Sequence, residues 1–181
     1  MSTRIMVTAM IRGFVVAFEG RGTRFGPGLN GRYRGIYRRP VWPSADAREN
    51  AALERYVFDL VDDDGLIADR HVASALASEL RQFGRAYEVM YCELVSAGVT
   101  PPPPGNFPLL GYDVSPIGGE YQSRLGCFPN DPRLLHFLDL LNANGLFDNV
   151  STGLEFAAKY TDLQLPEWDV PHGVFSIRLA D

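Results

Sequence analysis

The chain has 181 residues, of which 46% are hydrophobic and 22% charged, and its formal net charge is −5 at pH 7. The length fits one domain, and the composition excludes a disordered or low-complexity chain. The charge is unevenly placed, because residues 1–41 hold eight arginines and one acid, whereas residues 42–181 are strongly acidic. We therefore predict a single domain over residues 1–181 with a basic first segment.

The two cysteines, Cys92 and Cys127, are too few for a disulfide framework and indicate a reducing compartment. The apolar run at residues 5–11 is interrupted by Arg12, so it is not typical of a signal peptide. No apolar stretch reaches the roughly 18 residues that a membrane span requires. We expect a cytoplasmic protein with no membrane contact.

Strand and helix signals alternate in the first third of the chain. Residues 13–18 are β-branched and aromatic, which predicts a buried strand, and residues 20–43 read as a loop. Asp46 followed by Glu49 resembles a capping box before apolar positions that extend to Val61. This pattern predicts a helix that ends before the acidic turn at residues 62–65.

The most regular apolar pattern of the chain follows Asp69. Its steps of three and four predict the longest helix, with one stripe formed by Val72, Leu76, Leu80, Phe83, Tyr87, Met90 and Leu94. Gly98 and the prolines at 101–104 end this pattern, because four prolines favour an extended conformation. Residues 99–108 are therefore a candidate subdomain boundary.

The last third predicts two strands and two helices. The strands are residues 109–115 and residues 174–179, and the second alternates as a half-buried strand does. One helix follows Asp131 and Pro132 and stops at Gly145, and another begins at a capping box of Thr152 and Glu155. We detect no internal repeat. The predicted fold is α+β, with long central helices packed on a small sheet of N-terminal, middle and C-terminal strands.

Several segments resemble catalytic or ligand-binding motifs, but each lacks residues or elements that the motif requires. Residues 26–31 match the letters of a dinucleotide fingerprint but lack the flanking strand and helix. Aligning Gly65 with the sixth position of a calcium loop places Leu60 and His71 where carboxylates belong. The three histidines and two cysteines show no metal-ligand or nucleophile spacing. We predict no catalytic residue, no metal and no cofactor.

An acidic cluster is the first candidate interaction site. It comprises Asp59, Asp62, Asp63, Asp64 and Asp69. One interpretation is a solvated turn, and the other is a surface that attracts a basic partner and accelerates the encounter. We predict the second role for these five residues.

The basic first segment is the alternative candidate. Arginines interleaved with tyrosines can contact phosphates and stack on exposed bases, and here they are Arg21, Arg24, Arg32, Tyr33, Arg34, Arg38 and Arg39. The same segment could instead pair with the acidic remainder of the chain. Binding of nucleic acid through residues 20–41 is therefore the alternative function.

Four short motifs in the second half carry a resemblance. They are residues 110–115 (LGYDVS), 123–127 (SRLGC), 141–147 (LNANGLF) and 170–173 (VPHG). Together they make residues 109–181 resemble small bacterial immunity proteins, the partners of polymorphic toxins. The resemblance implies a cytoplasmic protein that blocks a cognate toxin by binding and has no catalysis of its own. From the residues alone, Tyr112, Asp113 and Ser123 have a structural role available, in which they cap backbone N–H groups.

Overall fold

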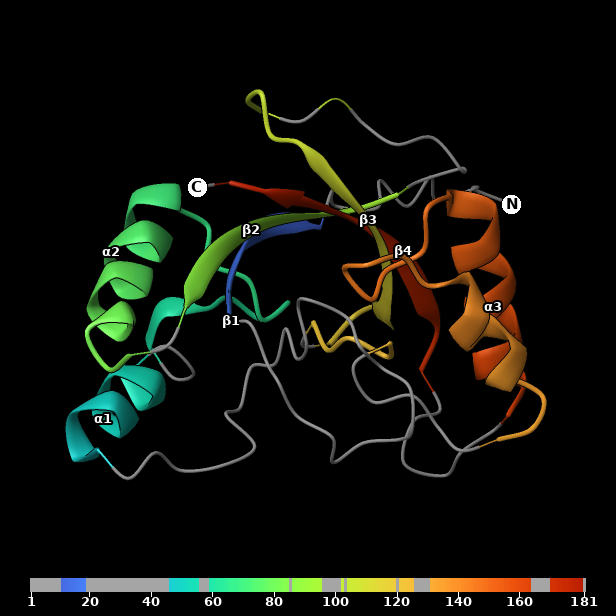
Figure 1. Ribbon diagram of the computed structural model, residues 1–181, viewed down its shortest axis with the longest axis horizontal. Helices are drawn as coiled ribbons and strands as arrows, with labels where there is room; N and C mark the ends of the chain where they lie inside the picture. The colour runs from blue at the N-terminus through green and yellow to red at the C-terminus, as the bar shows by residue number, and fades with distance from the viewer. Residues whose placement is uncertain are drawn as a thin grey trace, which may run out of the picture.

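The computed structural model describes residues 11–18, 46–55, 59–84, 86–95, 102, 104–119, 121–125, 131–163 and 170–180. Their elements, in chain order, are β1 (Arg12–Phe18), α1 (Ala47–Arg55), α2 (Arg70–Arg81), β2 (Tyr87–Leu94), β3 (Leu109–Pro116), the 3-10 helix η2 (Leu135–Leu140), α3 (Val150–Asp162) and β4 (His172–Leu179) (Figure 1). The strands form one antiparallel sheet in the order β1-β2-β4-β3. The fold is therefore α+β, as predicted.

Long central helices, as predicted, are not confirmed among the described residues. α2 has 12 residues and α3 has 13, and they lie at opposite ends of the sheet in Figure 1. None of the described helices combines the length and apolarity that crossing a bilayer would need. The prediction of a single domain stays a prediction, although strands from both halves of the chain share this sheet.

Only the first half of the helix predicted beyond Asp69 is helical, and the second half is a strand. α2 ends at Arg81, Gly84 has a left-handed backbone (φ 84°), and residues 87–94 form β2. β2 is covered on both faces, so its apolar residues are nearly continuous and fit the helical period by coincidence. β4 shows the same effect, because Val174 and Phe175 point to opposite faces and both are buried. The prediction of a half-buried last strand was wrong for this reason.

Helix starts also differ from the predicted ones. α3 begins at Val150 with Asn149 as its cap, whose side-chain oxygen accepts the Thr152 N–H at 2.9 Å, so Thr152 is not the cap.

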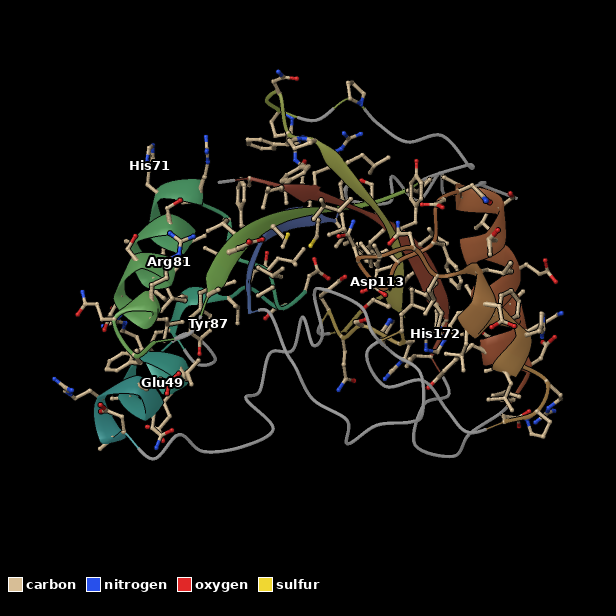
Figure 2. All side chains as sticks on the ribbon, viewed as in Figure 1. Glu49, His71, Arg81, Tyr87, Asp113 and His172 are labelled. Carbon is tan, nitrogen blue, oxygen red and sulfur yellow. The ribbon has the colours of Figure 1, made fainter. Side chains whose placement is uncertain are left out.

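At the start of α1, Asp46 does accept the Arg48 N–H, at 2.8 Å. Glu49, however, is buried and accepts the Tyr87 hydroxyl at 2.9 Å (Figure 2). The element after Asp131 is the 3-10 helix η2 rather than an α-helix.

The described parts of the two halves of the chain share one construction, although the sequence shows no internal repeat. Each half runs from an outer strand through a tight turn and a helix to an inner strand. The first half places Gly13, Asp62, Gly65, Leu66 and Asp69 where the second places Gly111, Asn142, Gly145, Leu146 and Asn149. The segment before the turn is longer in the first half, which hides the correspondence in the sequence.

Backbone hydrogen bonds establish this correspondence. Phe14 and Ile67 exchange two of them, each 2.8 Å long, and Tyr112 and Phe147 exchange two of 2.8 and 3.0 Å. Beside each pair a glycine lies under a leucine: a Cβ at Gly13 would be 2.7 Å from the Leu66 Cβ, and a Cβ at Gly111 would be 2.7 Å from that of Leu146. The close approach of the turn to the outer strand therefore requires glycine in both halves.

The two helices bury equivalent positions. Counted from the caps Asp69 and Asn149, the same four positions are buried in each, namely Ala73, Leu76, Ala77 and Leu80 in α2, and Gly153, Phe156, Ala157 and Tyr160 in α3. Gly13 pairs with Cys92, Gly111 pairs with Ile177, and Cys92 pairs with Ile177. A local twofold axis therefore passes between Cys92 and Ile177 at the centre of the sheet.

The twofold relationship places both helices on one face. The residues Arg12, Glu93, Ser176 and Tyr112 are direct cross-strand partners and so share that face. α2 packs on Phe14 and Val16 in one buried cluster, and Gly153 of α3 packs on Val174. The opposite face carries Met90 and Phe175. They belong to a larger cluster with Leu66, Leu146, Tyr121 and Leu125, and this cluster also includes Phe156, Ala157 and Tyr160 of α3.

Candidate partner-binding surface

The acidic turn at residues 62–65 is held by its own first residue. The Asp62 Oδ1 accepts the N–H groups of Asp64 at 3.0 Å and Leu66 at 2.9 Å. The backbone N–H of Gly65 donates to the Asp62 carbonyl, and the positive φ of Gly65 (75°) closes the turn. Two of the five predicted partner-binding residues thus have local structural roles, because Asp69 also caps α2 by accepting the His71 N–H at 2.7 Å.

The remaining three carboxylates of the predicted site differ in exposure. Asp59 and Asp63 are exposed, and Asp64 is half-buried. Burial, followed by the neighbouring charges of Asp62 and Asp63, raises the pKa of Asp64. The structure brings Asp62, Asp63 and Asp64 together in one turn, and it places Asp69 two residues beyond the Phe14–Ile67 bridge.

The second half provides the same turn without charge. The Asn142 Oδ1 accepts the N–H groups of Asn144 at 2.9 Å and Leu146 at 3.3 Å, and Gly145 closes the turn with a φ of 72°. Ala143 and Asn144 stand where the first half has Asp63 and Asp64. The backbone geometry therefore needs an acceptor at the first position and no carboxylate at the next two.

The acidic turn is anchored to the second half of the chain. The Tyr121 N–H donates to the Asp64 carbonyl at 2.6 Å. The Tyr121 hydroxyl in turn donates to the Asp113 Oδ2 on β3 at 2.7 Å. Because Tyr121 is buried and packs edge-on against Phe175, this link ties the turn to the hydrophobic core. Sequence reasoning missed Tyr121, since nothing local connects it to residue 64.

Asp113 is a fully buried carboxylate (Figure 2). Its Oδ1 accepts the Val114 N–H at 2.7 Å and the Ser123 hydroxyl at 2.9 Å. Burial raises the pKa of Asp113, although its hydrogen bonds act in the opposite direction. The predicted capping of backbone by Asp113 is confirmed, and Ser123 supports that carboxylate rather than the backbone.

His172 and Arg124 form a second polar cluster that the sequence did not indicate. Arg124 is 1% exposed, and its Nε donates to the His172 Nε2 at 3.2 Å. The other ring nitrogen, Nδ1, lies 3.2 Å from the Thr161 hydroxyl on α3. Burial and the Arg124 charge lower the pKa of His172 to about 4, so the ring is neutral at pH 7. A neutral ring with its proton on Nδ1 fits both contacts.

The described residues give no support to a metal site or a reactive cysteine. Within the described ranges, no three His, Cys, Asp or Glu side chains are grouped to hold a metal ion. Burial raises the pKa of the Cys92 thiol well above its ordinary value, which disfavours the reactive thiolate. The arginine and tyrosine residues of segment 20–41, residues 26–31 and Cys127 lie outside the described residues. Nucleic-acid binding through that segment stays a prediction.

Comparisons with known proteins add no relative. No family model, no curated protein and no solved structure matches the chain.

Proposed function

We propose that this protein is a non-enzymatic, cytoplasmic immunity-like protein that neutralises a cognate bacterial toxin by binding it directly. The proposal combines the resemblance of residues 109–181 to immunity proteins with one observation, the charge difference between two turns of the same geometry. The neutral turn at residues 142–145 shows that the fold does not require the Asp63 and Asp64 carboxylates. We attribute their presence to an external partner.

The chemistry of that partner follows from the electrostatics of the turn. Burial is the main cause of the raised pKa of Asp64, and the adjacent charges of Asp62 and Asp63 raise it further. A cationic surface would relieve this repulsion. Exposed charges of this kind act mainly on the rate of association and on specificity. The proposed partner is a toxin domain with a basic surface, such as the nucleic-acid-binding groove of a nuclease.

The test uses the two turns as a matched pair. We expect the toxin to be encoded beside this gene as the C-terminal domain of a secreted protein. Its association rate with the full chain is measured by stopped-flow fluorescence. We expect Asp63→Lys with Asp64→Lys to slow association about tenfold or more at low salt, and the difference to shrink at high salt. The control pair, Ala143→Lys with Asn144→Lys, carries the lysines on the neutral turn and should retain most of the wild-type rate.

Three outcomes would contradict the proposal. An unchanged rate in the Asp63 and Asp64 variant at low salt would remove this turn from the interface. The Asp63 and Asp64 pair changes the net charge by +4 and the control pair by +2. A control that slows association at least half as much on a logarithmic scale would therefore show that only the total charge matters. Failure of the full chain to bind the toxin domain, or to protect cells that express it, would overturn the immunity function itself.

A further inference from the structure

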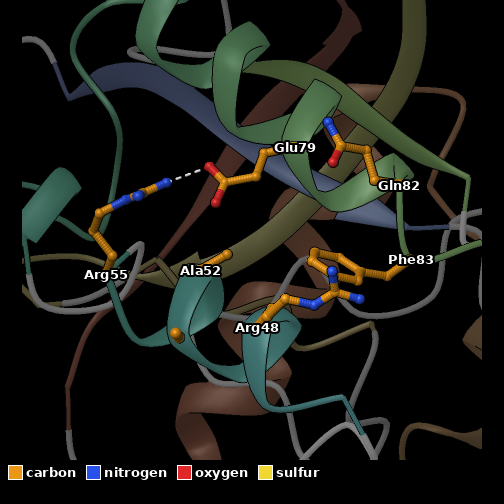
Figure 3. A pocket seen from close by; sticks show the side chains of 7 residues that line it. Arg48, Ala52, Arg55, Glu79, Gln82 and Phe83 are labelled. Atoms are coloured by element: carbon orange, nitrogen blue, oxygen red, sulfur yellow. Dashed lines mark hydrogen bonds and ion pairs between the residues drawn. The ribbon is translucent and has the colours of Figure 1, made fainter.

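A hollow between α1 and α2 has no counterpart in the proposed function. Its volume is about 480 Å³, and it is lined by Arg48, Ala51, Ala52, Arg55, Glu79, Gln82 and Phe83 (Figure 3). The volume lies in the range of small-molecule sites. α1 contributes Arg48 and Arg55, which are two helical turns apart, and the end of α2 contributes the facing residues.

The two guanidinium groups are positioned by carboxylate neighbours. The Arg48 Nη2 lies 3.0 Å from the Asp46 Oδ2, and the Arg48 guanidinium lies 5.6 Å from the centre of the Phe83 ring. Arg55 forms an ion pair with Glu79 across the hollow (Figure 3). Within the described part of the chain, the Nη1 groups of both arginines take part in no hydrogen bond. Each arginine therefore keeps N–H donors for a ligand while its carboxylate neighbour holds it beside the hollow.

The remaining lining is apolar on one side. Ala52 is buried and Phe83 is half-buried, so a ligand can contact the ring and the methyl group while its charged end meets the arginines. The Arg55–Glu79 pair is exposed, and pairs of this kind contribute about 1 kcal/mol or less, so a ligand can displace it at little cost. Guanidinium groups bind carboxylate and phosphate in a planar, two-point geometry.

We propose that this hollow binds a small aromatic anion, with its phosphate or carboxylate on Arg48 and Arg55 and its ring against Phe83 and Ala52. The site is independent of the acidic turn, which lies before the N-terminal end of α2, whereas Glu79, Gln82 and Phe83 lie at its C-terminal end. Occupancy would join α1 to the end of α2, so the ligand would also stabilise the packing of these two helices.

The test is an NMR titration of the full chain that follows the arginine Nε–Hε signals and the Phe83 ring. Phenyl phosphate and benzoate are the two probes, and inorganic phosphate and benzyl alcohol test the anion and the ring separately. We expect saturable shifts at Arg48, Arg55 and Phe83 with one or both aromatic anions, and weaker binding of each separate part. The probe that binds more tightly identifies the anionic group.

Variants sharpen this test. Arg48→Gln should weaken binding about tenfold, as expected for loss of a charge-assisted hydrogen bond, and Glu79→Gln should strengthen it by freeing Arg55. Arg133→Gln is the matched control, because Arg133 and Asp131 reproduce the contacts of Arg48 and Asp46 away from the hollow. Absence of saturable shifts, equal weakening by Arg133→Gln, or binding of inorganic phosphate as tight as that of phenyl phosphate would overturn the proposal.

Discussion

Asp62 and Asn142 occupy the same position in two copies of one turn. Each side-chain Oδ1 accepts the backbone N–H groups two and four residues further on, and a glycine with positive φ follows at the fourth position. The carboxylate and the amide thus perform one structural task. The pair separates what the fold needs at this site, a side-chain acceptor, from what it does not need, a negative charge.

This relationship predicts the effects of substitutions at Asp62. Asp62→Asn keeps the acceptor, so the free energy of unfolding should change by less than about 0.5 kcal/mol. Asp62→Ala removes the acceptor for two N–H groups and should lower the free energy of unfolding by about 1–2 kcal/mol. Urea denaturation followed by circular dichroism measures both values. Equal losses for Asn and Ala would show that the charge itself holds the turn.

The glycines of the outer strands should be intolerant of alanine in both halves. A methyl group at Gly13 or Gly111 would press on Leu66 or Leu146, and Gly111 also has a φ of 148°, which side chains rarely adopt. We expect each variant to lose about 1–3 kcal/mol of unfolding free energy, with the larger loss at Gly111. Gly119→Ala, which meets no atom within 4 Å, is the control. A neutral Gly13→Ala variant would contradict the repeat packing.

The effect of substituting the buried Asp113 on stability should depend on the residue at position 121. Val15 is the equivalent residue of the first half, so Asp113→Val fits the strand but leaves the buried Tyr121 hydroxyl without its acceptor. We expect a loss of about 2–4 kcal/mol for Asp113→Val. Adding Tyr121→Phe should restore about 1–2 kcal/mol, because the unpaired hydroxyl is removed. Additive losses in thermal or urea unfolding would refute this coupling.

His172 should make stability depend on mildly acidic pH. Its pKa is about 4 in the folded chain and 6.5 in the unfolded chain, so the unfolded state binds more protons between these values. The contribution of the neutral ring is complete above pH 6.5 and is lost as the pH falls toward 4. We expect the wild-type unfolding free energy to decrease over this range more steeply than that of His172→Gln.

The comparison of wild type with His172→Gln isolates one group, because glutamine keeps polar atoms near Arg124 but does not titrate. An NMR titration of the His172 ring protons gives the pKa directly. Identical pH profiles for the two proteins, or a measured pKa near 6.5, would contradict the contacts with Arg124 and Thr161.

The sequence by itself was sufficient for some of the local elements. The residues of β1 and β3, the acceptor at Asp46 and the acidic turn could be predicted because their signals lie within a few neighbours. The candidate surface was predicted only as a list of carboxylates. Which of them serve the backbone depended on distances across the turn and on comparison with residues 142–145.

Tertiary structure decided the rest. Residues 87–94 became a strand because hydrogen bonds to β1 and β4 outweigh an apolar spacing that also fits a helix. The repeat is hidden in the sequence because few residues match and the segment before the turn differs in length between the two halves. Links such as Tyr121 to Asp64 and Arg124 to His172 join segments far apart in the chain, and only packing brings such groups within hydrogen-bond distance.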